Sequence, residues 1–387
     1  MSIKYNVRVQ KEDTGHQDSY LVRKSVVSNG AKRTYPLAKS FKHKETSSPR
    51  SDSFHLNEIF LRLNDGRLSG VNRSKDIEDW LLHTYAARTS SKKFNVPFVN
   101  LHYASLRSKK MIAEACEILT DFIYANPATD LIVPPIIEFP DKTDHQKMYE
   151  EYTGIVNELT TTITDTVGDF KAAFFIPEFL NRNQVPKLLN FYSDRFGEEP
   201  LVIVDHNGRT FTSNSNRNFL VLRTLKREFD DGNFAVYCFN LKARKRSGGA
   251  VPSEDFLAFY NGMSFIGPSH KPMPIPKDVR EARTPSLGKM FIKEDLLYHP
   301  LLAGDARNSE SFPKEIQNSI PDYSGLSADE LRRLNDIHTE ERLSDVVNDT
   351  EGVLTSLTSD DFRTDLSELS RKRRSALNNK SVNDFFG

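Results

Sequence analysis

Cysteine is scarce in this chain. Only two of the 387 residues are cysteines, Cys116 and Cys238, and both lie in apolar runs. A disulfide framework or a cysteine-rich zinc site needs more cysteines than this, so both are excluded by count. We therefore expect two buried free thiols in a cytoplasmic protein.

Long apolar stretches and net charge are also missing. No run approaches the roughly 18 residues of a membrane helix, and the first residues lack the apolar core of a signal peptide. Lysine plus arginine equals aspartate plus glutamate, at 53 each, so the overall charge favours neither nucleic acid nor a membrane surface. The sequence predicts a soluble protein with no membrane partner, in which only local charge can favour a polyanion.

The glycine-rich signatures of nucleotide binding are absent as well, both G-x-G-x-x-G and G-x-x-x-x-G-K-[ST]. What is present is a repeated unit, a short apolar run followed by an amphipathic segment. The runs begin about 30 to 40 residues apart, the length of a β-strand plus a crossover helix. They cover residues 96–103, 131–139, 171–179, 201–208, 234–242 and 263–270.

The segments between the runs have helical spacing. One stripe follows Ser108, a residue type that caps helices, and another consists of Met148, Tyr152, Ile155, Val156, Leu159 and Ile163. Continuous apolar runs favour strands covered on both faces of a parallel sheet. With weaker units near Phe60 and Phe291, the count predicts a TIM-like (β/α) barrel rather than an open sheet.

Three regions are expected. Residues 1–95 form a mixed α+β extension, in which residues 20–38 can pair as a hairpin, 53–65 form a short helix or a strand, and 75–87 form a helix. Residues 96–347 form the barrel-type domain and end in a packing helix over 327–347, which begins with a capping-box pattern. Residues 348–387 form a flexible tail with a basic cluster at 371–374.

Nearly every predicted strand ends in an ionisable or hydrogen-bonding side chain, and in a parallel barrel these ends surround the active site. Asp205, followed by a glycine turn, is the candidate nucleophile or base, although an Asx-type turn would explain the same pattern. Glu178 and His102 are the other catalytic candidates. The predicted substrate-binding residues are Glu138, His206, Asn240, Ser269 and His270.

Other chemistry remains open at the same strand ends. His102, His206 and His270 could join a carboxylate around a metal, as in a hydrolase or lyase of a small molecule. No two of them have the local spacing of metal ligands, so no metal site is predicted. Strand ends are also simply the places where a chain becomes polar again.

Two segments suggest partners. One is a basic loop after a strand end, which contains Lys242, Arg244, Lys245 and Arg246. It is either a phosphate clamp for nucleic acid or a nucleotide, or simply a solvated loop. The last residues resemble the sliding-clamp-binding peptide of replication and repair proteins, which has a glutamine where this chain has Asn379. Val382, Phe385 and Phe386 match the apolar positions of that peptide. The alternative is that the two phenylalanines pack on the folded part of the protein.

From residue 130 to 270 the order of elements resembles the tRNA-guanine transglycosylase family of barrels. The segments that carry the resemblance are IIEFPDKTD, AFFIPEF, VIVDHNG and FAVYCFNLK, together with a late LNDIHTEERL. VNLHYAS stands where that family has Asp-Ser-Gly, MSFIGPSH has no aspartate at the place of the family's nucleophile, and the cysteine-rich zinc site is missing. The resemblance implies a barrel that exchanges or modifies a base, with Glu138 hydrogen-bonding the purine.

The leading hypothesis is therefore a barrel enzyme, or a diverged relative of one, that acts on nucleic acid or a nucleotide. The alternatives are the small-molecule hydrolase or lyase and a non-catalytic accessory protein whose C-terminal peptide recruits it to a sliding clamp.

Overall fold

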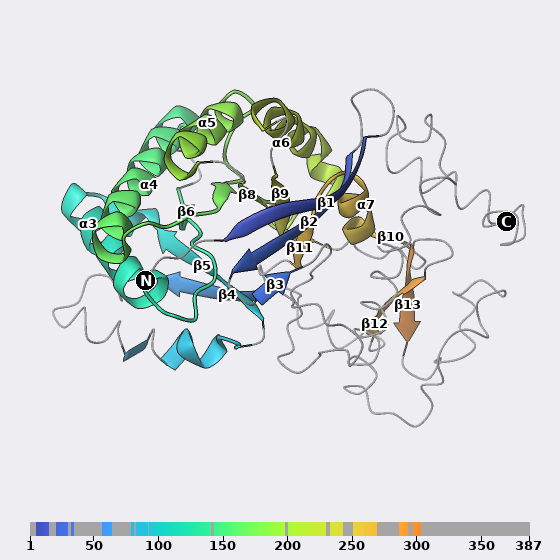
Figure 1. Ribbon diagram of the computed structural model, residues 1–387, viewed down its shortest axis with the longest axis horizontal. Helices are drawn as coiled ribbons and strands as arrows, with labels where there is room; N and C mark the ends of the chain where they lie inside the picture. Colours follow the sequence, from blue (N-terminus) through green and yellow to red (C-terminus); the bar gives the residue numbers. More distant parts are fainter. Residues whose placement is uncertain are drawn as a thin grey trace, which may run out of the picture.

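The computed structural model describes residues 5–14, 21–29, 32–34, 56–63, 79–80, 83–91, 93–140, 143–197, 200–229, 233–242, 251–268, 286–292 and 297–302. They form a mixed α/β fold with two parallel sheets, two antiparallel sheets and flanking helices (Figure 1). Several predictions lie outside these residues: the helix over 327–347, the tail from 348, and the site residues Arg244, Lys245, Arg246, Ser269, His270, Val382, Phe385 and Phe386.

The first parallel sheet has the order β4 (Leu56–Leu63), β5 (Phe94–His102) and β6 (Ile136–Glu138). Strand β4, one of the two outcomes left open for 53–65, pairs with β5 along its full length, so this part of the expected extension belongs to the sheet. Every residue of β5 before its last is buried, as expected for a strand covered on both faces. Strand β6 begins only after Pro134 and Pro135, which have no N–H to donate to a neighbour.

The second parallel sheet has the order β11, β9, β8 and β7. Each of the six apolar runs overlaps one strand of the two parallel sheets, so the predicted strands are confirmed, with β5 beginning two residues before its run. The strands of the second sheet are β7 (Phe174–Ile176), β8 (Leu201–Asp205), β9 (Ala235–Leu241) and β11 (Phe265–Pro268).

The two parallel sheets meet at both edges. Ile132, just before β6, forms a parallel bridge with Ala172, just before β7. At the other edges the hydroxyl of Tyr237 on β9 donates to the carboxylate of Glu58 on β4. A Cβ added at Gly267 on β11 would collide with that carboxylate, so a larger residue here would force the Glu58 side chain to move.

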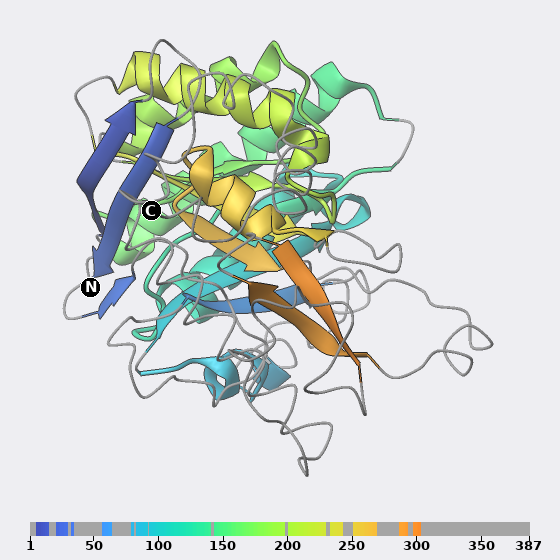
Figure 2. The ribbon, with the colours of Figure 1, turned by 90° about the vertical axis from the view of Figure 1, so that its right-hand side faces the viewer.

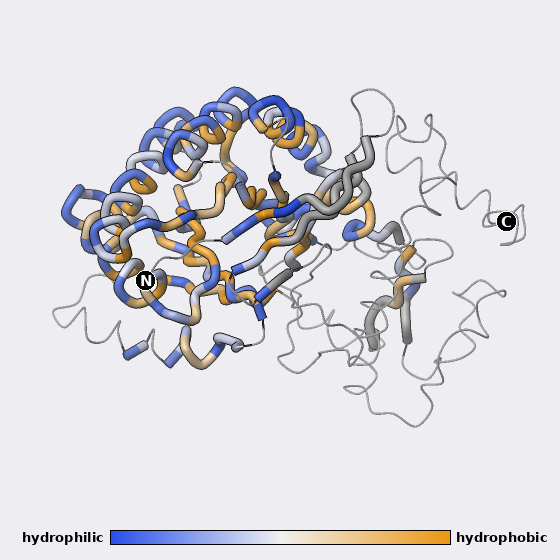
Figure 3. Tube along the Cα trace, viewed as in Figure 1, coloured by the Kyte–Doolittle hydropathy of each residue, from blue (hydrophilic) through white to orange (hydrophobic). Residues whose placement is uncertain are grey.

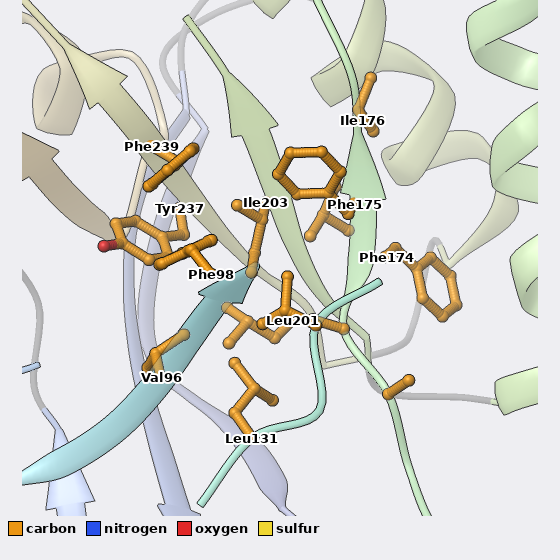
Figure 4. Packing of buried hydrophobic residues seen from close by; sticks show 14 of the residues in the cluster. Val96, Phe98, Leu131, Phe174, Phe175, Ile176, Leu201, Ile203, Tyr237 and Phe239 are labelled. Carbon is orange, nitrogen blue, oxygen red and sulfur yellow. The ribbon is translucent and has the colours of Figure 1, made fainter. Parts of the chain in front are cut away.

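Aromatic side chains fill the space between the sheets. Phe98 of β5 stacks on Phe239 of β9, with ring centroids 3.9 Å apart, and packs edge-on against Tyr237. Figure 4 shows these rings and Ile203 of β8 pointing toward one another. Phe174 points away from them, and its ring stacks on Tyr192 of a covering helix. The core therefore has an inner part between strands and an outer part between strands and helices.

The larger helices form an arc outside the strands, with hydrophobic residues on their inner sides (Figures 1 and 3). They are α3 (Lys109–Leu119), α4 (His145–Val167), α5 (Gln184–Phe196), α6 (Ser215–Glu228) and the shorter α7 (Glu254–Tyr260). All six residues of the predicted α4 stripe are buried, and Ser108 accepts a hydrogen bond from the Met111 amide at 3.3 Å, as its capping role predicts. None of the helices among the described residues is long and apolar enough to cross a membrane.

Shorter helical turns complete this body: η1 (Ala86–Arg88), η2 (Tyr103–Leu106), the π-helical η3 (Thr120–Tyr124) and η4 (Thr212–Asn214). In the helix expected over 75–87, residues 79, 80, 83 and 84 are helical and the chain continues into η1.

An N-terminal antiparallel sheet covers the amino ends of the parallel strands. It contains β1 (Asn6–Thr14), β2 (Leu21–Asn29) and β3 (Lys32–Thr34); the expected hairpin corresponds to β2 and β3, and β1 is an addition. The hydroxyl of buried Tyr5 donates to the carbonyl of Ala172 at 3.1 Å and accepts from the amide of Leu201 at 3.0 Å. Figure 2 shows β1 and β2 in blue beside the helical body.

A second antiparallel sheet, β10-β13-β12, consists of β10 (Val251–Pro252), β12 (Ser286–Ile292) and β13 (Leu297–Leu302). The prediction of a further strand–helix unit near Phe291 is wrong, because β12 pairs antiparallel with β13. Two consecutive strands joined by a short connection form a hairpin and leave no room for a crossover helix. The unit near Phe60 does join the parallel system, through β4.

Candidate active site at the carboxyl ends of the parallel strands

Polar side chains from three neighbouring strands meet at the end of the first parallel sheet. Asn100 on β5 donates its Nδ2 to Glu138 Oε1 on β6 at 2.6 Å, and Arg62 on β4 donates to Glu138 Oε2 at 3.0 Å. The register places His102 opposite Glu138, and the imidazole is exposed. We call Arg62, Asn100, His102 and Glu138 the Glu138 cluster. The two hydrogen bonds hold the Glu138 carboxylate in one orientation, while 34 % of the Glu138 side chain stays accessible.

A second group, the Asp205 cluster, lies at the ends of β7, β8 and β9. Asp205 Oδ1 accepts from the Asn207 amide at 2.8 Å, which is the Asx-type turn that the sequence left open, and from Asn240 Nδ2 at 3.4 Å. Asn207 donates its Nδ2 to Glu178 at 3.2 Å, and Arg209 forms an ion pair with Glu178 at 2.8 Å. These contacts join two carboxylates into one network.

Backbone conformation gives this cluster its shape. Asn207 and Asn240 have positive φ values of 52° and 60°, in the left-handed region that asparagine tolerates better than most residues. At these two residues the chain changes direction after each strand. As a result the Gly208 amide donates to the Asn240 carbonyl at 2.9 Å, and the Lys242 amide donates to the Arg209 carbonyl at 2.9 Å. The two strand ends are thereby fixed to each other, with Lys242, the first residue of the basic loop, at their margin.

The two clusters stand above the same aromatic pair. Asp205 lies opposite Phe239 in the parallel register, and Phe239 stacks on Phe98. Asn100 follows Phe98 by two residues and therefore shares its face of β5. Both rings are completely buried, so the aromatic pair is core packing that supports the two polar clusters from below. Figure 4 shows the two rings packed between β5 and β9.

His206 does not line this site. Its imidazole is completely buried, with Nδ1 3.3 Å from Asn214 Nδ2 and the ring stacked near Phe211. Burial, and secondarily the charge of Arg217, lower the pKa of His206 to about 3, so it is neutral at pH 7. The placement favours a core histidine over the predicted substrate ligand.

Sequence reasoning missed Arg217 and Asn100. Arg217 on α6 donates to the carbonyls of Asp205 at 3.0 Å and Ile176 at 3.1 Å, and also to the carbonyl of Pro177. Burial lowers the pKa of its guanidinium, while Asp205 and Glu178 oppose that shift. Its acceptors are backbone atoms of distant strands, which no local pattern reveals. Asn100 was hidden inside an apolar run.

No metal centre emerges from the described residues, among which no group of three or more histidine, cysteine, aspartate or glutamate side chains is placed to hold an ion. The chain matches no model of a known protein family and no curated protein.

Proposed function

We propose that the two parallel sheets form one closed (β/α) barrel. The support is the pair of links at the sheet edges, the Ile132–Ala172 bridge on one side and the Tyr237–Glu58 hydrogen bond on the other. Successive strands with helices outside and aromatic rings inside are consistent with such closure. In a barrel the Glu138 and Asp205 clusters share the carboxyl-terminal mouth.

We further propose that this mouth acts on a base of a nucleic acid or nucleotide, in a transglycosylase-like exchange or modification. The observation that carries the proposal is the pair of carboxylate clusters at the carboxyl ends of the parallel strands. An oriented carboxylate accepts hydrogen bonds from the ring N–H and amino groups of a base. We assign that recognition to Glu138, which Asn100 and Arg62 orient.

Asp205 is the proposed nucleophile. One of its carboxylate oxygens attacks C1′ of the nucleoside, the C1′–N bond breaks, and its electron pair stays on the departing base, which takes a proton. The nitrogen of an incoming base then attacks C1′ and loses its proton, and the ester bond breaks to restore the carboxylate. We assign the proton transfers to Glu178 and His102. The Asx-type turn and Asn240 hold Asp205 in position for both steps.

Two partner sites belong to the same proposal. Lys242, Arg244, Lys245 and Arg246 bind backbone phosphates, and Val382, Phe385 and Phe386 bind a sliding clamp. Reversing the four charges should weaken binding to tRNA or DNA and flatten its dependence on salt, because fewer counterions are released. A peptide of residues 379–387 should bind a purified clamp, and alanine at both phenylalanines should abolish that binding.

The direct test is incorporation of labelled guanine into tRNA and into single- and double-stranded DNA, with Asp205→Asn beside the wild type. Asp165→Asn, an exposed aspartate on α4, is the matched control. Incorporation that Asp205→Asn abolishes and Asp165→Asn retains supports the proposal. Absence of incorporation from every substrate, or full activity of Asp205→Asn, contradicts it.

A further inference from the structure

A groove lies outside the mouth, between the first turns of α5 and α6. Its volume is about 490 Å³, within the range of small-molecule sites. We call it the α5–α6 groove, and its lining includes Arg182, Arg217 and Arg223 but no acidic residue.

The guanidinium groups of the groove make no direct contact with a carboxylate in the described part of the chain, although burial lowers the pKa of Arg217 and the nearby carboxylates of Asp205 and Glu178 oppose that shift. None of Arg182, Arg217 and Arg223 forms an ion pair there. Arg217 is held by neutral backbone carbonyls, and its buried Nε has no hydrogen-bond partner among the described residues. Arg182 and Arg223 are exposed beside it. Like charges gathered in this way repel one another and favour an anionic ligand.

The groove also presents an aromatic ring. Phe219 is 46 % exposed, and it is the exposed large hydrophobic residue of the described chain. Leu180, Val185 and Leu220 supply apolar lining beside it. An accessible ring next to arginines is the combination with which proteins bind single-stranded nucleic acid, since every base can stack and every phosphate is anionic.

The groove adjoins the mouth through one side chain. Arg217 lines the groove and donates hydrogen bonds to the carbonyls of Ile176 and Asp205, at the carboxyl ends of β7 and β8. Figure 1 shows α5 and α6 side by side above these strands. A strand with one base in the mouth would pass its next nucleotides across this rim.

We propose that the α5–α6 groove binds a nucleotide unit of a single-stranded nucleic acid, with phosphate on Arg182, Arg217 and Arg223 and the base stacked on Phe219. The choice of a strand, rather than a free nucleotide, rests on the proposed function.

The test is fluorescence anisotropy with labelled DNA and RNA strands of about twelve nucleotides, a length typical of single-strand sites. The variant is Arg182→Ala with Arg223→Ala; Arg217 is left intact because it also holds strand ends. The matched control is Arg195→Ala with Arg227→Ala, exposed arginines of the same helices that already have intramolecular partners. We expect about a tenfold loss of affinity in the variant, and a salt slope smaller by about 1.4 for two lost phosphate contacts. The control should stay within about twofold of the wild type.

Phe219 provides a second measurement. Phe219→Ala should lower affinity about five- to a hundredfold, and Phe219→Trp should retain it. The new indole should be quenched saturably by the oligonucleotide, against the background of Trp80, the single tryptophan of the chain. Unchanged affinity in both the arginine and Phe219→Ala variants would overturn the inference. So would tighter binding of AMP than of the strand, or Phe219-dependent dimerisation without strand binding, which would assign the groove to a second copy.

The outcomes separate this inference from the proposed function. If the protein exchanges no base but the groove variants lose strand binding, the groove proposal is supported and the proposed base exchange is contradicted. If exchange depends on Asp205 but the groove variants bind strands normally, the base exchange is supported and the groove proposal is contradicted.

Discussion

The two ends of the parallel strands are built differently. At the amino ends, Tyr5 connects β7 to β8, and Asp130 accepts from Lys32 at 2.6 Å and from the Asn95 amide at 2.8 Å. At the carboxyl ends, Glu138 and Glu178 are partly exposed. Buried, paired polar groups hold a fold together, and Asp205 resembles Asp130 in being buried and hydrogen-bonded. The two ends therefore differ in the exposure of Glu138 and Glu178, and the following variants test whether they also differ in activity.

The largest expected effect is at Asp205. Asp205→Asn should reduce base exchange about a thousandfold or more, since an amide cannot act as the nucleophile. Stability should fall by about 1 kcal/mol, because asparagine keeps the Asx-type turn but no longer offsets the buried charge of Arg217. Steady-state kinetics and urea unfolding measure the two quantities. A large loss of stability would show that Asp205 belongs with the structural carboxylates.

Asp130→Asn should give the opposite result. Asparagine still accepts from the Asn95 amide, but Lys32 loses its counterion in a site where only 20 % of the lysine side chain is exposed. The cost should be about 2 kcal/mol, less than for a fully buried pair because water reaches the lysine. Exchange per folded molecule should be unchanged, and a loss of activity at full stability would break the comparison.

Tyr5→Phe tests the same end without changing charge. It leaves the Ala172 carbonyl and the Leu201 amide without the hydroxyl that connects them. We expect a loss of about 2 kcal/mol in the free energy of unfolding, the cost of unsatisfied buried groups. Tyr149→Phe, a partly buried tyrosine whose hydroxyl has no hydrogen bond among the described residues, is the control and should be nearly neutral.

His206 predicts a pH dependence. Its pKa is lowered to about 3 by burial, so its contribution to stability is present above the unfolded value of 6.5 and is lost as pH falls toward 3. Between about pH 7.5 and pH 5 the wild type should lose roughly 2 kcal/mol through this group. Burial raises the pKa of Asp130, whose contribution is instead present at low pH and lost as pH rises, so the two effects oppose each other. The difference between wild type and His206→Gln across the range isolates the histidine, and an equal loss in both proteins would refute its role.

The smallest expected effect is that of Glu138→Gln, at the exposed carboxylate of the carboxyl ends. Glutamine can still accept a hydrogen bond from Asn100, but it lacks the negative charge that strengthens hydrogen bonds from the N–H groups of the base. We expect KM for the base to rise about tenfold, with kcat less affected. Glu158→Gln, on an exposed part of α4, should leave KM unchanged. A fall in kcat alone would move Glu138 from recognition to chemistry.

Elements with local patterns could be predicted from the sequence, and those that depend on distant partners could not. The α4 stripe and the Ser108 cap are properties of adjacent turns, and both are confirmed. Strand β1 was missed because its sequence NVRVQKEDT is mostly polar, although its partner β2 is the next strand along the chain. Phe291 was assigned to the wrong kind of unit because an apolar run does not reveal its pairing direction.

The site divides in the same way. Asp205, Glu138 and Glu178 could be found because strand ends are visible in sequence. The burial of His206 could not, since it depends on Phe211 and Asn214 folding over the ring. Arg217 and Phe219 belong to a helix whose polarity indicates only solvent exposure.

Gly267 has a consequence for how this protein can vary. Its backbone approaches the Glu58 carboxylate so closely that even a methyl group would collide with it. The atoms that the methyl group would meet are the ends of the Glu58 and Tyr237 side chains, so a substitution at 267 requires these two side chains to move and alters the hydrogen bond between them. The link between β9 and β4 therefore depends on the space that residue 267 leaves open.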